Sequence, residues 1–271
     1  ARQIAGDRIS LSMLLRPGTE SHSYEPTAKD MIALEHCDVF LCTGGEGDQW
    51  VEQLLGAVSN PNLQVVRMVD CVPLLEEEAV EGMLHHHEEE EHSEHGEFDE
   101  HVWASPVNAA AIAEEICAVF CEKDPDNALF YQTNMRSYHD ELMRLDSLFR
   151  GIVSGSSRKT LVVGDRFPFR YLVEEYGLSY FAAFPGCASD TGASASAIAF
   201  LVEKVKAEGI PAVFHIEFSN CKIAGVICEE TGAELLEFHS CHNVSADDFS
   251  AGVTYLDLMR RNAENLREAL N

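Results

Sequence analysis

Histidine and acidic residues crowd into one segment of this chain. Residues 85–101, HHHEEEEHSEHGEFDEH, hold 6 of the 12 histidines and 8 Asp or Glu residues. Neutral imidazole is a common ligand for zinc and related cations, and the carboxylates attract such ions. The segment has almost nothing with which to build an apolar core, so it is expected to offer many weak metal sites instead. The accessory ligands predicted here are His85, His86, His87, His92 and His95.

Other histidines fall where an α/β protein gathers its ligands. His22, His215 and His239 each lie where a predicted strand ends or a loop begins, and His101 precedes the motif VWASP. Three or four imidazoles from distant loops would form one metal site of modest size. Any one of them taken alone is more often a hydrogen-bonded structural residue. His242 is the weaker candidate, because a turn or helix would be needed to aim it and His239 at one ion.

Composition narrows the classes of partner. The chain has 271 residues, 46% of them hydrophobic, and a formal net charge of -27. Such a charge repels nucleic acid and anionic membranes and favours cations as partners. No run of about eighteen apolar residues is long enough to span a bilayer. The 9 cysteines form no CxxC pair, so a zinc ribbon or thioredoxin-type site is disfavoured.

The elements that would position these residues alternate between short apolar runs and helical patterns, which favours α/β layers with parallel sheets. Two halves are expected, joined by one long helix, with a ligand in the cleft between them. The predicted lobes are residues 1–124, containing the His/Glu-rich loop 85–100, and residues 153–271, with a bridging helix at 125–152. Strands are expected at 8–15, 38–44, 63–70, 160–165, 211–218 and 233–239, and helices at 28–37, 48–58, 106–123, 126–150, 169–177, 195–209, 222–232 and 249–270.

Several motifs together resemble one protein family. They are IAGDRISLSMLLRPGTESHSYEPTAKD, HVWASPVNA, FRYLVEEYGL and AGVTYLDLMRRN, and they extend over nearly the whole chain. In order and spacing they are similar to the zinc- and manganese-specific solute-binding proteins of bacterial ABC transporters. The resemblance implies two α/β lobes bridged by a long rigid helix, with the metal held between the lobes.

Carried over by position, the resemblance implies His22 and His101 as the first two metal ligands. Its third ligand, a His or Glu, falls on Arg166, which has no lone pair to offer a cation. Its fourth, an Asp or Glu in most members, falls on His239. A nitrogen-rich site suits Zn²⁺ better than Mn²⁺.

The departure at Arg166 leaves the coordination sphere incomplete. His215 or Asp165 is expected to supply the remaining ligand, or else a water molecule does. Arg166 is expected to pair with an acidic group such as Glu217 beside the metal, so both would support the site without touching the ion.

The predicted function is an extracytoplasmic zinc receptor that delivers Zn²⁺ to the permease of an ABC transporter. The resemblance implies a periplasmic or lipid-anchored location, with the signal segment absent from this chain. We expect a monomer that binds no nucleic acid and no organic substrate. The alternatives are a manganese receptor, a zinc-buffering protein that uses only the acidic loop, and a zinc hydrolase with Glu217 as base. No HExxH motif is present, so an enzyme is not favoured.

Overall fold

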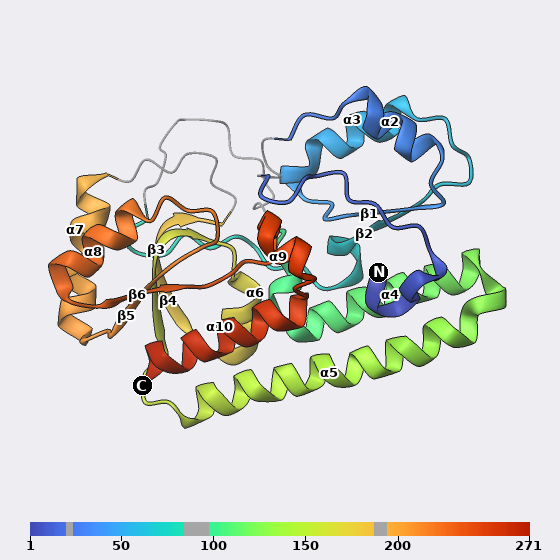
Figure 1. Ribbon diagram of the computed structural model, residues 1–271. Helices are drawn as coiled ribbons and strands as arrows, with labels where there is room; N and C mark the ends of the chain where they lie inside the picture. Colours follow the sequence, from blue (N-terminus) through green and yellow to red (C-terminus); the bar gives the residue numbers. More distant parts are fainter. Residues whose placement is uncertain (20–23, 84–97, 187–193) are drawn as a thin grey trace.

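The computed structural model describes residues 1–19, 24–83, 98–186 and 194–271. The predicted ligand His22 and the five histidines of the acidic loop lie outside these residues. Two α/β lobes stand side by side, and one long helix, α5 (Ala128–Gly155), runs beneath both of them (Figure 1). The two-lobe α/β prediction is confirmed.

The N-terminal lobe is built around a small parallel sheet. Strands β1 (Val39–Cys42) and β2 (Gln64–Arg67) pair in register from Val39 opposite Gln64. Helices α2 (Ala28–Glu35) and α3 (Gln49–Ala57) lie over one face, and α4 (Pro106–Lys123) lies under the other (Figure 1). The short helix α1 (Arg2–Ala5) packs against α5 and α4.

The strand predicted at residues 8–15 is wrong. The segment starts in a 3-10 turn, Gly6–Arg8, and continues without strand pairing to any described residue. Leu11 is 44% exposed and Met13 is 48% exposed, so their apolar side chains do not contribute to a sheet face. Local apolar alternation predicts a strand only where a neighbouring strand can supply the hydrogen bonds.

The C-terminal lobe holds a four-stranded parallel sheet in the order β4-β3-β5-β6. The central strand β3 (Thr160–Phe167) is buried along most of its length, as both faces are covered by helices. One face packs on α7 (Ala195–Glu208) and α8 (Lys222–Thr231), and the other on α5, α6 (Arg170–Tyr176) and α10 (Tyr255–Leu270). The other strands are β4 (Ser179–Pro185), β5 (Ala212–His215) and β6 (Glu234–Glu237).

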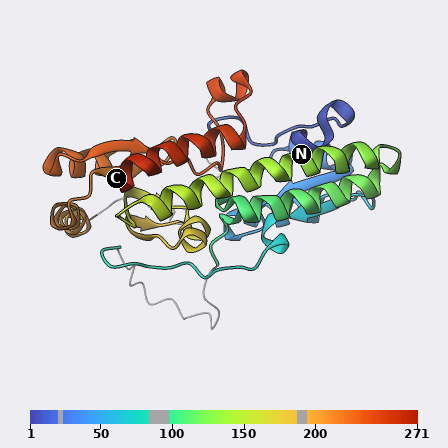
Figure 2. The same ribbon diagram turned by 90° about the horizontal axis from the view of Figure 1, so that it is seen from below.

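Helix α5 belongs to both lobes. Its 28 residues extend roughly 42 Å at 1.5 Å per residue. Tyr131 and Met135 are buried in the N-terminal core beside α4, whereas Leu142 and Phe149 are buried in the C-terminal core. Seen from below, α4, α5 and α10 lie close to parallel (Figure 2). The helix does not stop at Gly151 as its sequence suggested, because a single helical glycine costs only about 1 kcal/mol.

Two further elements differ from prediction. Strand β4 was not predicted, and it occupies an edge of the larger sheet. The single closing helix expected at 249–270 is two helices, α9 (Ala246–Ala251) and α10. Gly252 ends α9 with a left-handed φ of 73°, and Thr254 starts α10 with a capping box to Asp257.

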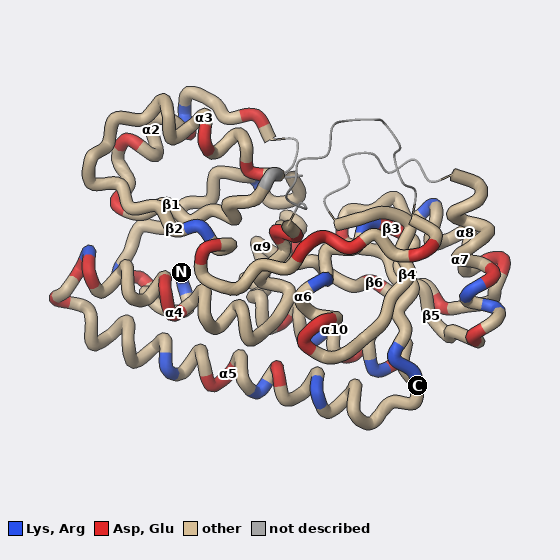
Figure 3. Tube along the Cα trace, turned by 180° about the vertical axis from the view of Figure 1, so that it is seen from behind, with Lys and Arg blue, Asp and Glu red and all other residues tan. Residues whose placement is uncertain are grey.

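Among the described residues, acidic positions occur along the chain in both lobes (Figure 3). Among the described helices, none combines the length and the apolar character that crossing a bilayer would need.

Candidate metal site

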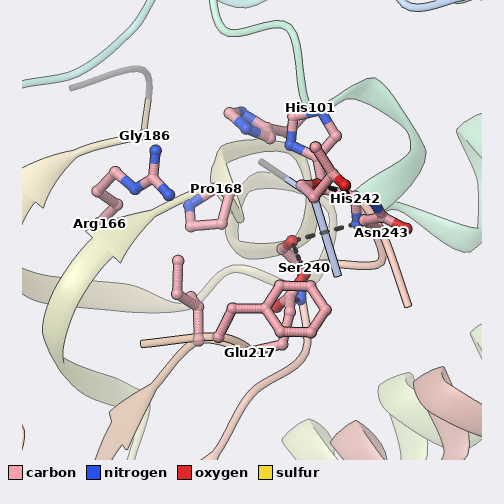
Figure 4. Close-up of a pocket in the computed structure, with 11 residues that line it drawn as sticks. His101, Arg166, Pro168, Gly186, Glu217, Ser240, His242 and Asn243 are labelled. Atoms are coloured by element: carbon pink, nitrogen blue, oxygen red, sulfur yellow. Dashed lines mark hydrogen bonds between the residues drawn. The ribbon is translucent and has the colours of Figure 1, made fainter. Parts of the chain in front are cut away.

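A pocket opens between the lobes at the carboxyl ends of the larger sheet's strands. Its volume is about 390 Å³, counting the open mouth. Arg166 comes from the end of β3, Glu217 follows β5, Ser240 follows β6, and His101 comes from the N-terminal lobe (Figure 4). Thr19 of the N-terminal lobe also lines the pocket. This is the edge at which parallel sheets collect ligands. The full lining is Thr19, His101, Arg166, Pro168, Gly186, Ile216, Glu217, Phe218, Ser240, His242 and Asn243.

His101 is held rigidly on the N-terminal side of the pocket. It is 1% exposed and begins the 3-10 turn Val102–Ala104. Its Nδ1 lies 3.1 Å from Asp99 Oδ1, and the same oxygen accepts the His101 backbone N–H at 2.8 Å. With Nδ1 donating to the carboxylate, the lone pair sits on Nε2, which is the arrangement typical of a metal-binding histidine.

Asp99 also sets the charge state of His101. Burial alone would lower the pKa of His101, but the charge and hydrogen bond of Asp99, together with the charges of Glu100 and Glu77, outweigh it, so the pKa is raised. A metal ion must displace this proton, which makes binding at His101 sensitive to pH.

His242 faces His101 from the C-terminal lobe. The two ring centroids are 5.5 Å apart and their planes are perpendicular. Two imidazoles on one tetrahedral zinc, each with a Zn–N distance of about 2.1 Å, would have centroids about 5.3 Å apart. The pair therefore has the spacing that a shared zinc ion requires. The indole of Trp103 lies against both rings, 5.5 Å from His101 and 5.1 Å from His242.

The loop that carries His242 is shaped by Glu217. This carboxylate is buried and accepts hydrogen bonds from the Ser240 backbone N–H at 2.7 Å and from the Ser240 hydroxyl. The same hydroxyl oxygen accepts the His242 backbone N–H at 3.2 Å. Cys241, between them, takes a left-handed φ of 60°, which is rare for a side chain with a Cβ. Glu217 thus positions His242 through Ser240.

Three residues predicted as ligands lie outside the pocket lining. His239 is 4% exposed; its Nδ1 accepts the Cys241 N–H at 2.9 Å, and its backbone is hydrogen-bonded in both directions to Asn262 of α10. His215 Nδ1 is 2.9 Å from its neighbour's carbonyl oxygen, and Asp165 accepts the Arg166 backbone N–H. Within the described residues, no three His, Cys, Asp or Glu side chains gather as a metal cluster.

The two predicted supporting residues, Arg166 and Glu217, both line the pocket. Cys241, in the loop between Ser240 and His242, does not offer a thiolate. Desolvation, reinforced by the charge of Glu217, raises the pKa of Cys241 well above its usual value, so the thiol stays protonated at neutral pH.

Hydrogen bonds also join the lobes around the pocket. Asn243 Nδ2 donates to the carbonyl oxygens of Arg16 at 3.0 Å and Thr19 at 2.7 Å. Trp103 Nε1 donates to the Ser240 carbonyl at 2.8 Å, inside a fully buried contact. These bonds tie residues 16–19 and Trp103 of the N-terminal lobe to the loop of residues 240–243.

Phe218 is strained at the pocket mouth. It has a φ of 60° and is 52% exposed. Because a left-handed backbone costs an L-residue roughly 1–2 kcal/mol, Phe218→Gly is expected to raise the free energy of unfolding of the metal-free protein by about 0.5–1 kcal/mol. Urea denaturation of the metal-free chain measures this change.

A matched control is Phe249→Gly, which removes a similarly exposed ring (55%) from inside helix α9. The free energy of unfolding of this variant is expected to fall by about 1 kcal/mol, since glycine destabilises a helix. If Phe218→Gly also destabilises the chain, the ring's contacts outweigh the backbone strain and the argument is wrong.

Comparison with known proteins places this geometry in context. A model of the family described as the periplasmic component A of the zinc-uptake complex matches residues 1–269. The chain is 30% identical over 267 residues to the zinc-binding lipoprotein AdcA of Streptococcus pneumoniae, covering 98% of this chain and 52% of AdcA. It is 28% identical to the high-affinity zinc uptake system protein ZnuA of Bacillus subtilis, covering 99% of this chain and 83% of that protein. The chain thus spans about half the length of AdcA.

Solved structures agree on the fold. The Zn(II)-bound ZnuA-like domain of S. pneumoniae AdcA superposes with a TM-score of 0.80 at 27% identity, covering 99% of this chain and 93% of that domain. The metal-dependent lipoprotein YcdH of B. subtilis superposes with a TM-score of 0.83 at 26% identity, covering 100% of this chain and 94% of that one. A manganese-bound periplasmic protein of Candidatus Liberibacter asiaticus gives 0.81 at 21% identity, so it shares the fold.

Proposed function

Because this chain belongs to the family of periplasmic zinc-uptake components, we propose that it is the metal receptor of an ABC-type uptake system. It would bind Zn²⁺ outside the cytoplasm and hand the ion to a membrane permease. The observation that carries the proposal is the pair His101 and His242, which face one pocket from opposite lobes with their ring centroids 5.5 Å apart. The role is stoichiometric binding and release, without turnover.

The proposed ligand set revises the sequence-based one. His101 and His242 are the two ligands that the pocket supports. His22 remains the third, from the family resemblance, and Thr19, three residues earlier, lines the pocket. His242 replaces His239. The Nδ1 lone pair of His239 accepts a backbone N–H, so the proton of the neutral ring is on Nε2 and neither nitrogen can bind the ion. Three imidazoles favour zinc over manganese, which prefers carboxylate-rich sites.

The acidic loop is proposed as an accessory. It would collect Zn²⁺ near the pocket or respond when zinc is plentiful, while the interlobe site holds the ion that is delivered. Its deletion should therefore leave one tight site. The buffering alternative predicts the opposite, because in that case the loop is the whole binding function.

Competitive titration tests the proposal directly. Zinc and manganese are titrated into the full chain and into a chain lacking residues 85–97, a deletion that spares Asp99 and its bond to His101. One zinc per chain, retained after deletion and bound far more tightly than manganese, supports the receptor. Loss of all zinc with the loop would favour the buffering protein, and equal affinity for manganese would favour a manganese receptor.

Glu217→Gln is expected to weaken zinc binding by roughly tenfold, since residues that orient metal ligands typically contribute 10–100-fold to affinity. The amide cannot accept both Ser240 hydrogen bonds, so the loop carrying His242 loses its anchor. The matched control is Glu237→Gln, the same change of charge on β6, outside the pocket lining. Unchanged affinity in Glu217→Gln would show that the loop keeps its shape without this carboxylate.

A further inference from the structure

The indole of Trp103 packs against both imidazoles of the proposed metal site. Its ring centroid lies 5.5 Å from that of His101 and 5.1 Å from that of His242, and the two imidazole centroids are 5.5 Å apart. The three rings therefore form a triangle with nearly equal sides. Closely packed side chains resist compression, so the indole limits how far either imidazole can tilt or shift. Trp103 is not among the described residues that line the pocket, so it supports the two rings without facing the ion.

Two polar groups of Trp103 are bonded to the opposite lobe. Its indole N–H donates to the Ser240 carbonyl at 2.8 Å, and its backbone carbonyl accepts the hydroxyl of Tyr255, at the start of α10, at 2.7 Å. These partners lie 137 and 152 residues further along the chain. Trp103 is 7% exposed, so water has little access to replace either bond, and a buried polar group without a partner is costly. Trp103 thus fastens the N-terminal lobe to the C-terminal lobe at two points.

Short stretches of bonded backbone connect Trp103 to each histidine. In the N-terminal lobe, the Ala104 N–H donates to the His101 carbonyl at 3.0 Å, which closes the 3-10 turn that contains Trp103. In the C-terminal lobe, the Ser240 hydroxyl accepts the His242 N–H at 3.2 Å. His101 is therefore tied to Trp103, and His242 is tied to Ser240. The bond from the indole to Ser240 joins these two units and sets the distance between the histidines.

On the basis of the proposed function, we infer that Trp103 is a positioning residue for zinc. It holds His101 and His242 at the separation that one ion requires before the ion arrives, and it slows the release of the ion. Ligands that are already in place lose little freedom on binding. Release requires an imidazole to move away from the ion, and the packed indole with its bonds to Ser240 and Tyr255 opposes that movement. Differences in affinity between variants of one site are mostly differences in dissociation rate.

The rate of zinc release tests the inference. The zinc-loaded full chain is mixed at pH 7.5 with an excess of a chromophoric chelator, and the absorbance of the chelator reports the released ion. Trp103→Phe keeps an aromatic ring but removes the indole N–H. Tyr255→Phe removes the hydroxyl that bonds to the Trp103 carbonyl and leaves the indole in place. The matched control is Tyr176→Phe, which removes a hydroxyl bonded to Asp146 within the C-terminal lobe.

Trp103→Phe should release zinc about tenfold faster, since residues that orient metal ligands typically contribute 10–100-fold to affinity. Tyr255→Phe should release it about threefold faster, the effect expected from one hydrogen bond. Tyr176→Phe should keep the unsubstituted rate to within about twofold, because distant sites act independently. The association rate should change less than the dissociation rate in both Trp103→Phe and Tyr255→Phe.

Bound Co²⁺ supplies a readout that a general loss of stability would not change. Its visible absorption depends on the number and geometry of its ligands. At saturating Co²⁺, Trp103→Phe should shift or weaken this band, because the two imidazoles lose their fixed separation. Tyr176→Phe should keep the band of the unsubstituted chain, even if its melting temperature falls.

Three results overturn the inference. They are an unchanged release rate in Trp103→Phe, an unchanged Co²⁺ band in that variant, or release from Tyr176→Phe as fast as from Trp103→Phe. If Trp103→Phe does not fold, Tyr255→Phe decides, since an unchanged release rate there contradicts the role of the bonds between the lobes. Each of these results leaves the receptor proposal intact, because the chain still binds zinc. Absence of zinc binding in the unsubstituted chain refutes the receptor proposal itself.

Discussion

Replacing His242 with alanine is expected to lower zinc affinity by about 100-fold or more. Loss of a residue that merely orients a ligand costs 10–100-fold, so loss of a ligand should reach at least the upper end of that range. The side chain lies at a pocket rim, and its backbone N–H bond to Ser240 survives the substitution. The melting temperature of the metal-free chain should therefore change little. Competition with a chelator of known affinity measures the loss.

His239→Ala is the matched comparison, three residues away in the same loop. Here the expected result is reversed. Removing this buried ring leaves the Cys241 N–H without its acceptor, so the free energy of unfolding should fall by roughly 2 kcal/mol. Zinc affinity should stay close to that of the unsubstituted chain. If zinc is lost with His239 and kept without His242, the assignment of the two histidines made from the pocket is wrong.

Acidification from pH 7.5 to 5.5 is expected to weaken zinc binding by about 100-fold. His101 has a raised pKa, so it is protonated already at pH values above the usual 6.5. Below that pKa the zinc affinity falls tenfold per pH unit for each imidazole that must release a proton. His101 alone gives about tenfold between pH 6.5 and 5.5, and its partner imidazoles add to the loss. Titrations at half-unit intervals measure the profile.

Asp99→Asn separates the contribution of His101. Without the carboxylate, the pKa of His101 loses the contributions of Asp99 that raise it and is therefore lower, so the decline in affinity should begin at a lower pH. In the metal-free chain, the contribution of His101 to folding stability depends on pH in the opposite direction to the zinc affinity. A raised folded pKa stabilises the fold fully below about pH 6.5, and this contribution is lost as pH rises through the folded pKa. A profile that is identical in Asp99→Asn would show that His101 does not exchange its proton for the metal.

Local sequence signals predicted those elements whose stabilising contacts are between residues close in the sequence. Ser105 and Pro106 mark the start of α4, and the Ser105 hydroxyl indeed accepts the N–H groups of Val107 and Asn108. The segment at 8–15 has an apolar pattern but lacks a strand partner among the described residues, and β4 was overlooked although it pairs with β3 over most of its length. Strand pairing is a long-range property, so a single segment does not contain it.

The site shows the same limit on a finer scale. The family resemblance pointed to His101 as a ligand and to Arg166 with Glu217 as neighbours of the site, and all three line the pocket. It chose His239 over His242 because an ordinary turn gives no reason for the later residue to face the ion. The choice depends on the left-handed backbone of Cys241 and on the bonds from Ser240 to Glu217, which lies 23 residues earlier. The conformation of a loop that distant contacts hold cannot be predicted from the sequence of the loop alone. The sequence did offer His242 as a candidate, but as the weaker one.

Helix α5 has a consequence for the way the molecule unfolds. Its first half completes one hydrophobic core and its second half completes the other, so neither lobe can melt without exposing part of a helix that the other lobe needs. The free energies of the two cores are therefore coupled through one continuous stretch of hydrogen bonds. Heating should produce a single cooperative transition rather than two. Zinc, although it touches only a few side chains, should then raise the midpoint of that one transition for both lobes together.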